Sequence, residues 1–184
     1  MAEPPAGPFP APVQRALFER RIILLGGTVD TAAAGDAAAA LMTLDALGDD
    51  PIVLRLNADS DSLEAAFSLI DTIDVIGVDV HASVASTVGG TMVGVLAVSA
   101  RRAMSSLGRI HLREPRASFA GTAVDLARHA DNYEQRWEAF IRRLAGACGR
   151  PFEHVEADLR CGRMLDSTSA LQYGLVDEVS DRRS

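Results

Sequence analysis

The fold class is decided by one stretch near the start of the chain, Arg21-Ile22-Ile23-Leu24-Leu25-Gly26-Gly27. A short apolar run that ends at two glycines is typical of a buried strand. The Ala-rich segment 31–47 follows and predicts a helix, and a second buried strand is expected over 52–56. Buried strands that alternate with helices indicate a mostly parallel sheet. The sequence therefore predicts an α/β fold.

The same alternation continues along the chain. A polar turn is expected over 57–61, after which Ser62 caps a helix. Gly89 and Gly90 are expected to break the chain before the next helix. Further strands are expected within 75–84 and over 108–112 and 175–179, and further helices over 91–100, 122–147, 152–159 and 167–173, the last ending at Gly174.

Composition and charge narrow the possible functions. The chain has 184 residues, of which 48% are apolar and 23% charged, as expected for one folded domain. The net charge of −7 argues against a nucleic-acid partner. Without a run of about 18 apolar residues, no membrane span is expected. Cys148 and Cys161 lack the spacing of a zinc site or disulfide framework and indicate reduced thiols in a cytoplasmic protein.

The domain boundaries are predicted from the ends of this pattern. Residues 1–14 are rich in proline and predict a flexible N-terminal arm. Residues 15–180 form a single domain, and 181–184 form a tail.

Three segments resemble the ClpP family, the proteolytic subunits of the Clp protease. Residues 21–27 (RIILLGG) resemble the family's entry strand RIIFLGG. Residues 108–115 (GRIHLREP) resemble its (A/S)RIMIHQP strand, and residues 170–177 (ALQYGLVD) resemble its ALEYGLID segment. The order and spacing of the three segments extend the resemblance over about residues 15–179.

The resemblance implies a fold and an assembly. The family fold is a wedge of stacked αββ units with a projecting helical handle, and it is related to the crotonase fold. Family subunits form two stacked seven-membered rings around a closed chamber, into which an AAA+ unfoldase feeds unfolded protein. The expected partners are therefore copies of this chain in heptameric or tetradecameric rings, an active ClpP subunit, and an AAA+ unfoldase.

The resemblance also assigns positions to the family's catalytic groups. The serine nucleophile, the histidine base and the aspartate of the family triad correspond here to Thr91, Arg113 and Gly162. The oxyanion positions correspond to Ser60, Asp61 and Met92.

These substitutions predict a subunit without peptidase activity. Arg113 cannot act as a general base, because a guanidinium stays protonated at any working pH. Gly162 has no side chain with which to orient a base. A carboxylate such as Asp61, about 5 Å from a developing oxyanion, would repel it by about 3 kcal/mol. We therefore expect a structural or regulatory role in a ring-shaped assembly, without a metal ion or cofactor.

Two alternatives remain from the residues alone. An active hydrolase with a rewired site would pair Thr91 with His111, which precedes Arg113 by two residues on the same strand. A crotonase-like acyl-CoA enzyme is the other, although Asp61 disfavours its oxyanion pair. Asp59 and Asp61 are interpreted as a solvated turn rather than a metal site, since a further ligand at suitable spacing is missing from the sequence.

The long helix over 122–147 is expected to form the handle. Its apolar residues recur every three or four positions, and its outer half, nearest Gly121, is assigned to a partner subunit. The segment 116–120 is expected to be extended and to pair with a second copy. The stripe consists of Leu126, Tyr133, Trp137, Phe140 and Leu144.

Overall fold

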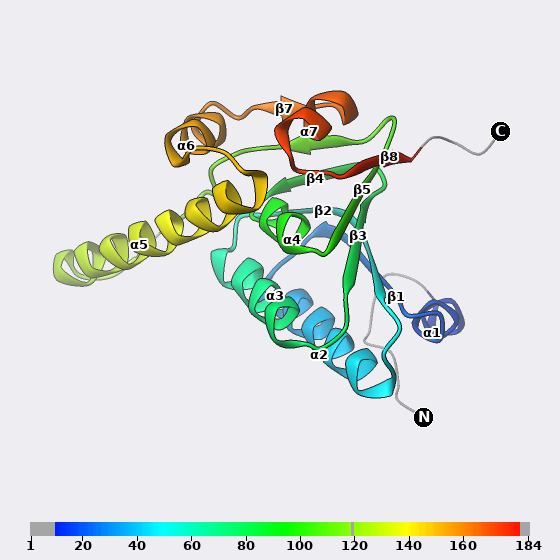
Figure 1. Cartoon of the computed structure of the whole chain (residues 1–184). Helices are drawn as coiled ribbons and strands as arrows, with labels where there is room; N and C mark the ends of the chain where they lie inside the picture. The colour runs from blue at the N-terminus through cyan, green and yellow to red at the C-terminus, as the bar shows by residue number, and fades with distance from the viewer. Residues whose placement is uncertain (1–9, 119, 181–184) are drawn as a thin grey trace.

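The structure is a computed structural model that describes residues 10–118 and 120–180. Helices and strands alternate along the chain as the sequence predicts (Figure 1). The helices are α1 (Ala11–Phe18), α2 (Thr31–Leu47), α3 (Leu63–Val75), α4 (Met92–Val98), α5 (Ala123–Cys148), α6 (Phe152–Arg160) and α7 (Ser167–Tyr173). The strands are β1 (Ile22–Thr28), β2 (Ile52–Ser60), β3 (Val80–Val84), β4 (Thr87–Gly90), β5 (Arg101–Ser105), β6 (Arg109–His111), β7 (Met164–Leu165) and β8 (Glu178–Ser180).

The described strands pair into a sheet whose central strand is β2. Their order is β7-β6-β4-β2-β3-β5-β8, and β1 pairs with β2 as well. All of these pairs are parallel apart from β6 with β7. Strand β2 changes its neighbour along its length, since its first half lies beside β3 and its last two residues lie beside β4. The predicted α/β fold is confirmed.

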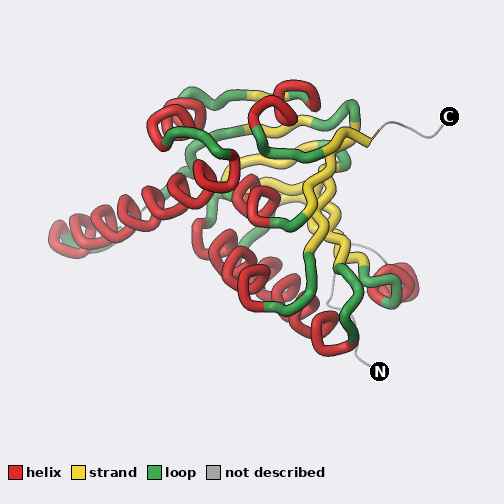
Figure 2. The backbone as a smooth tube through the Cα atoms, in the orientation of Figure 1, coloured by secondary structure: helices red, strands yellow, loops and turns green. Residues whose placement is uncertain are grey.

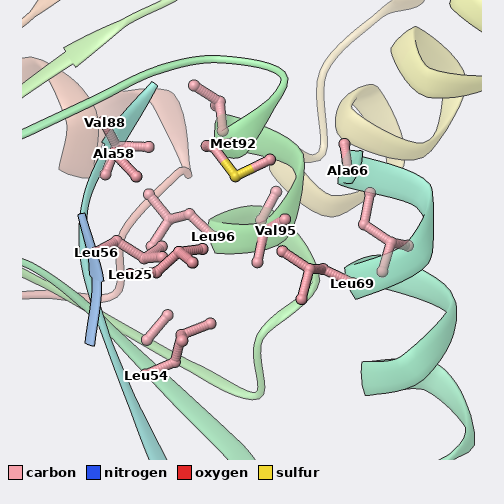
Figure 3. Close-up of a cluster of buried hydrophobic side chains, with 14 of the residues drawn as sticks. Leu25, Leu54, Leu56, Ala58, Ala66, Leu69, Val88, Met92, Val95 and Leu96 are labelled. Atoms are coloured by element: carbon pink, nitrogen blue, oxygen red, sulfur yellow. The ribbon is translucent and has the colours of Figure 1, made fainter. Parts of the chain in front are cut away.

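The core lies between the sheet and helices α2, α3 and α4, which cover the same face (Figures 1 and 2). Strand β2 contributes Leu54 and Leu56, which are fully buried, and α4 contributes Val95 and Leu96 (Figure 3). Leu69 of α3 closes this cluster from the other side. Small and branched side chains dominate the core and let the helices lie close to the sheet.

Local signals in the sequence account for the helix ends. Asp30 accepts a hydrogen bond from the Ala33 amide at 2.8 Å and begins α2. Ser62 begins α3 in the same way, which confirms its predicted role. Helix α7 ends at Gly174, whose φ of 84° is in the left-handed region that favours glycine.

Helix α5 has two halves with different surroundings. The C-terminal half packs on the body through buried residues such as Trp137, Phe140 and Leu144. The N-terminal half projects beyond the body (Figure 1), and Val124 there is 73% exposed. A single projecting helix is what the resemblance implies for the handle.

Several expectations are corrected by the structure. Residues 57–60 are not a turn but the end of β2, because their alternating burial fits a strand that has β1 and β4 as neighbours. Gly89 and Gly90 do not break the chain but end β4. Strands β4, β5 and β7 were not expected from the sequence. The segment 112–118 has no regular strand in its described residues.

The chain ends differ in part from the predicted boundaries. Residues 11–14 of the predicted arm belong to helix α1. The rest of that arm up to residue 9 and the predicted tail over 181–184 lie outside the described residues. Within the described ranges, none of the helices combines the length and apolar character that a membrane span requires.

Candidate functional site

The residues expected at the catalytic positions surround the carboxyl ends of β2, β4 and β6. Asp59 and Ser60 of β2 lie beside Gly89 and Gly90 of β4. Gly89 in turn lies beside His111 of β6. Ligand sites of α/β sheets lie at the carboxyl ends of parallel strands. These residues lie at that edge of the sheet, where β2 exchanges β3 for β4 as its neighbour.

Thr91 lies immediately after β4 and is completely buried. Its Oγ1 donates a hydrogen bond to the carbonyl oxygen of Ser62 at 2.9 Å and lies 3.4 Å from that of Ser60. Its amide also donates to the Ser60 carbonyl, at 3.0 Å. The hydroxyl is therefore bound to main-chain acceptors. Its hydrogen bonds secure the start of α4 to the β2–α3 connection.

Arg113 follows β6 and binds two carboxylates at once. Its Nη2 donates to Asp59 Oδ1 at 2.6 Å, and its Nη1 donates to Asp61 Oδ1. The Arg113 side chain is 19% exposed, whereas both aspartates remain more open to solvent. The amide of Arg116 donates to the same Asp61 oxygen at 3.1 Å. Asp59 and Asp61 are therefore not merely a solvated turn.

The ion pairs keep these groups charged. Burial raises the pKa of Asp61, but the hydrogen bonds from Arg113 and from the Arg116 amide outweigh it and leave the pKa below its ordinary value. Burial lowers the pKa of Arg113, and the two carboxylates more than reverse this. The Asp61 charge, expected to repel an oxyanion without compensation, is instead paired with Arg113.

Gly90 allows this arrangement because it has no side chain. Its φ is +56°, and a Cβ atom there would lie 2.1 Å from the Ser60 carbonyl oxygen. The same atom would lie 2.8 Å from Asp59 Oδ1 and 3.1 Å from Arg113 Nη2. The ion pair thus lies directly against the backbone of Gly90.

The residues at the expected oxyanion positions do not direct hydrogen-bond donors at the Thr91 hydroxyl. Ser60 is buried, and its Oγ donates to the Val29 carbonyl at 2.6 Å and accepts from the Ser62 amide at 3.0 Å. Met92 is the first residue of α4, and its side chain is buried in the core (Figure 3). The groups directed at the Thr91 hydroxyl are the Ser60 and Ser62 carbonyl oxygens, whereas an oxyanion requires donors.

Gly162, at the acid position, lies close to His111. Its φ is +69°, and a Cβ atom there would lie 3.6 Å from His111 Nε2. A carboxylate at position 162 would therefore meet His111. In residues 10–118 and 120–180, the hydrogen bonds of Thr91 involve main-chain carbonyls, and none joins it to His111.

The structure also bears on metal binding at this site. The described part of the chain contains no group of three or more His, Cys, Asp or Glu residues that could hold a metal ion. Asp59 and Asp61 bind the Arg113 guanidinium instead.

Sequence reasoning placed Arg113 and Asp61 at the site but missed that they bind each other. The available signal was their charge, because two carboxylates spaced two residues apart at one strand end attract a nearby cation, here from the segment that follows β6. Asp59 was missed as a site residue because the segment was interpreted as a turn, in which its side chain would face solvent.

Comparisons with known proteins agree on one family. A sequence profile of the Clp protease family matches residues 10–183. The ATP-dependent Clp protease proteolytic subunit 3 of Rhodococcus jostii is 35% identical over 169 residues, which cover 89% of this chain and 82% of that protein. The proteolytic subunit 1 of Corynebacterium glutamicum is 30% identical over 171 residues, which cover 91% of this chain and 82% of that protein. The chain described here belongs to the Clp protease family.

Proposed function

We propose that this chain is a Clp protease subunit without peptidase activity that has a structural or regulatory role in a ring-shaped assembly. One observation carries the proposal: the residue at the position of the general base is Arg113, and its guanidinium is bound by Asp59 and Asp61. A permanently protonated group in this state cannot take a proton from a nucleophile.

The nucleophile and acid positions support the same conclusion. The Thr91 hydroxyl is buried and donates its proton to a main-chain carbonyl, so a base cannot reach it without rearrangement. Gly162 has no side chain that could orient an imidazole. In serine proteases the loss of triad members lowers the rate by about 10⁶-fold.

The proposed assembly follows from the relatives and from α5. The relatives are named as ATP-dependent proteolytic subunits, and on this basis we propose that the chain joins heptameric or tetradecameric rings. The projecting half of α5 supports this, since Val124 and Leu126 are exposed there. An active ClpP subunit and an AAA+ unfoldase are the proposed partners.

The activity part of the proposal is tested on the purified chain. Fluorogenic peptides should be cleaved no faster than in buffer, and a serine-directed phosphonate should not label Thr91. An active ClpP subunit, assayed in parallel, shows that both reagents work. Stoichiometric labelling of Thr91, or peptide turnover that is lost in Thr91→Ala, would overturn the proposal.

Repair variants show which groups limit activity. The triple variant Thr91→Ser, Arg113→His and Gly162→Asp should not by itself restore full activity, because the Ser60 side chain remains at an oxyanion position and Asp61 then lacks its cation. Adding Ser60→Gly and Asp61→Gly should help more than the triad alone. If the triple variant cleaves peptides as fast as an active ClpP subunit, this account of the oxyanion positions is wrong.

A further inference from the structure

We infer that Arg113, Asp59 and Asp61 form an ion-pair clamp that holds the segment 112–118 against the end of β2. Through Pro115 of this segment, the clamp also helps to hold α5 in place at Tyr133. The inference deepens the proposed function and rests on it, because a working catalytic site would need position 113 for chemistry. In this chain Arg113 instead connects the segment 112–118 to the end of β2.

The segment 112–118 depends on individual contacts because it lies outside regular secondary structure. Its main chain is anchored on one side, where the Leu112 amide donates to the Arg163 carbonyl and the Glu114 amide donates to the Leu159 carbonyl. On the other side Arg113 and the Arg116 amide reach Asp61, and Arg113 also reaches Asp59. The clamp thus supplies the attachment to the central strand.

One further contact continues from the segment to the long helix. The Tyr133 hydroxyl, on α5, donates to the Pro115 carbonyl at 3.2 Å. Burial, together with the negative charges of Glu114, Asp61 and Glu64, raises the pKa of Tyr133 to about 12. The hydroxyl therefore keeps its proton and remains a donor at neutral pH. Pro115 therefore links the clamp to α5, and loss of the clamp should also loosen the helix around Tyr133.

The geometry requires an arginine. One terminal nitrogen of the guanidinium binds Asp59 and the other binds Asp61, so a planar, two-pronged cation fits the two carboxylates. Without this cation, two carboxylates two residues apart would repel each other. The close approach to Gly90 places the guanidinium, which is 19% exposed, against the backbone, whereas both carboxylates remain open to water.

Hydrogen exchange measured by mass spectrometry on the full chain tests the clamp. In Arg113→Met, the amides of 112–118 and of the part of α5 around Tyr133 should exchange about tenfold faster than in the parent. Arg113→Lys should lie between the two, because an ammonium lacks the two-pronged geometry. The matched control is Arg101→Met, which removes the exposed ion pair with Glu178 and should leave these amides unchanged.

Asp59→Asn with Asp61→Asn provides a second route if Arg113→Met does not fold, since the amides keep the shape of the site and remove both negative charges. This variant should also accelerate exchange in 112–118. Unchanged exchange there, or acceleration spread evenly over the chain, would overturn the clamp. Peptide turnover by the parent would instead overturn the proposed function, so the two failures are distinguishable.

Discussion

Arg113 changes the chemistry of the strand ends through a single side chain. Its guanidinium neutralises much of the charge of Asp59 and Asp61, which would otherwise oppose any negative intermediate nearby. It also lies close to Gly90, where an added Cβ atom would be 3.1 Å from its Nη2. Arg113, which stands at the position of the catalytic base, therefore also balances the negative charges of Asp59 and Asp61 at the end of β2.

The stability contributed by Asp61 should depend on pH. Its folded pKa lies below the unfolded value of about 3.9, so the contribution is fully present above that value and is lost as the pH falls through the folded pKa. The parent should therefore be more stable than Asp61→Asn at neutral pH, and the difference should shrink below about pH 4. Urea unfolding of both proteins over this pH range measures it.

The Arg113→Met background provides the control for this dependence. With the cation removed, Asp61→Asn should destabilise the protein much less at neutral pH, and the change of this difference on acidification should be smaller, because the Arg116 amide is then the remaining donor described for Asp61. A difference that persists unchanged in that background would mean that Asp61 acts through another partner.

At the scale of elements, local signals decided which segments were predictable. Helix α2 has the predicted bounds because an Ala-rich run lies between two clear ends, Asp30 and Gly48. Strand β4 was missed because two glycines usually interrupt a strand. Strand β5 was missed because only two residues separate it from α4 and because it begins with two arginines. Both strands depend on neighbours distant in sequence, which local patterns do not reveal.

The candidate site was predictable in its members but not in its contacts. The resemblance brought Thr91 and Arg113 together from separate segments, whereas the direction of the Thr91 hydroxyl depends on how β2 continues through Ser60. The proximity of Gly162 to His111 likewise follows from the antiparallel pairing of β6 with β7, which the sequence did not indicate.

Gly94 allows α4 to approach α5 closely. A Cβ atom there would lie 2.4 Å from Phe140 Cε2 and 3.2 Å from Ile70 Cδ1. The Phe140 ring is stacked on Trp137 and has little room to move. Gly94→Ala should therefore reduce the free energy of unfolding by about 1–3 kcal/mol in urea titrations.

Gly146→Ala is the matched control for this helix contact, because Gly146 lies on the exposed face of α5 with nothing within 4 Å of the added Cβ. It should raise the stability by about 0.5–1 kcal/mol. If Gly94→Ala is equally stabilising, the close approach of α4 and α5 is not required.

At the scale of the whole molecule, α5 divides the chain into a packed body and a projecting half-helix (Figure 1). The structure shows which apolar residues of α5 are exposed and therefore available to a partner subunit. Tyr133 is half-buried and bound to Pro115 of its own chain, so the proposed contact between subunits begins nearer the helix start. Val124 and Leu126 are the exposed apolar side chains in that part of α5.

Replacing Val124 and Leu126 with aspartate should therefore prevent rings from stacking. The parent should behave as a particle of seven or fourteen subunits, alone or with an active ClpP subunit, because a second copy would cover the exposed side chains of Val124 and Leu126. In Val124→Asp with Leu126→Asp, each charge would be buried without a partner, and single rings or monomers should result.

Light scattering on the purified proteins measures these masses directly. Leu107→Asp is the control, because Leu107 is 85% exposed in the turn between β5 and β6, away from α5, and its replacement should leave the particle intact. Tyr133→Phe should also leave the mass unchanged, since it removes a hydrogen bond within one chain. A parent that stays monomeric and gains no mass with an active ClpP subunit would contradict the ring assembly itself. A large parent particle unaffected by both aspartates would place the contact elsewhere on the surface.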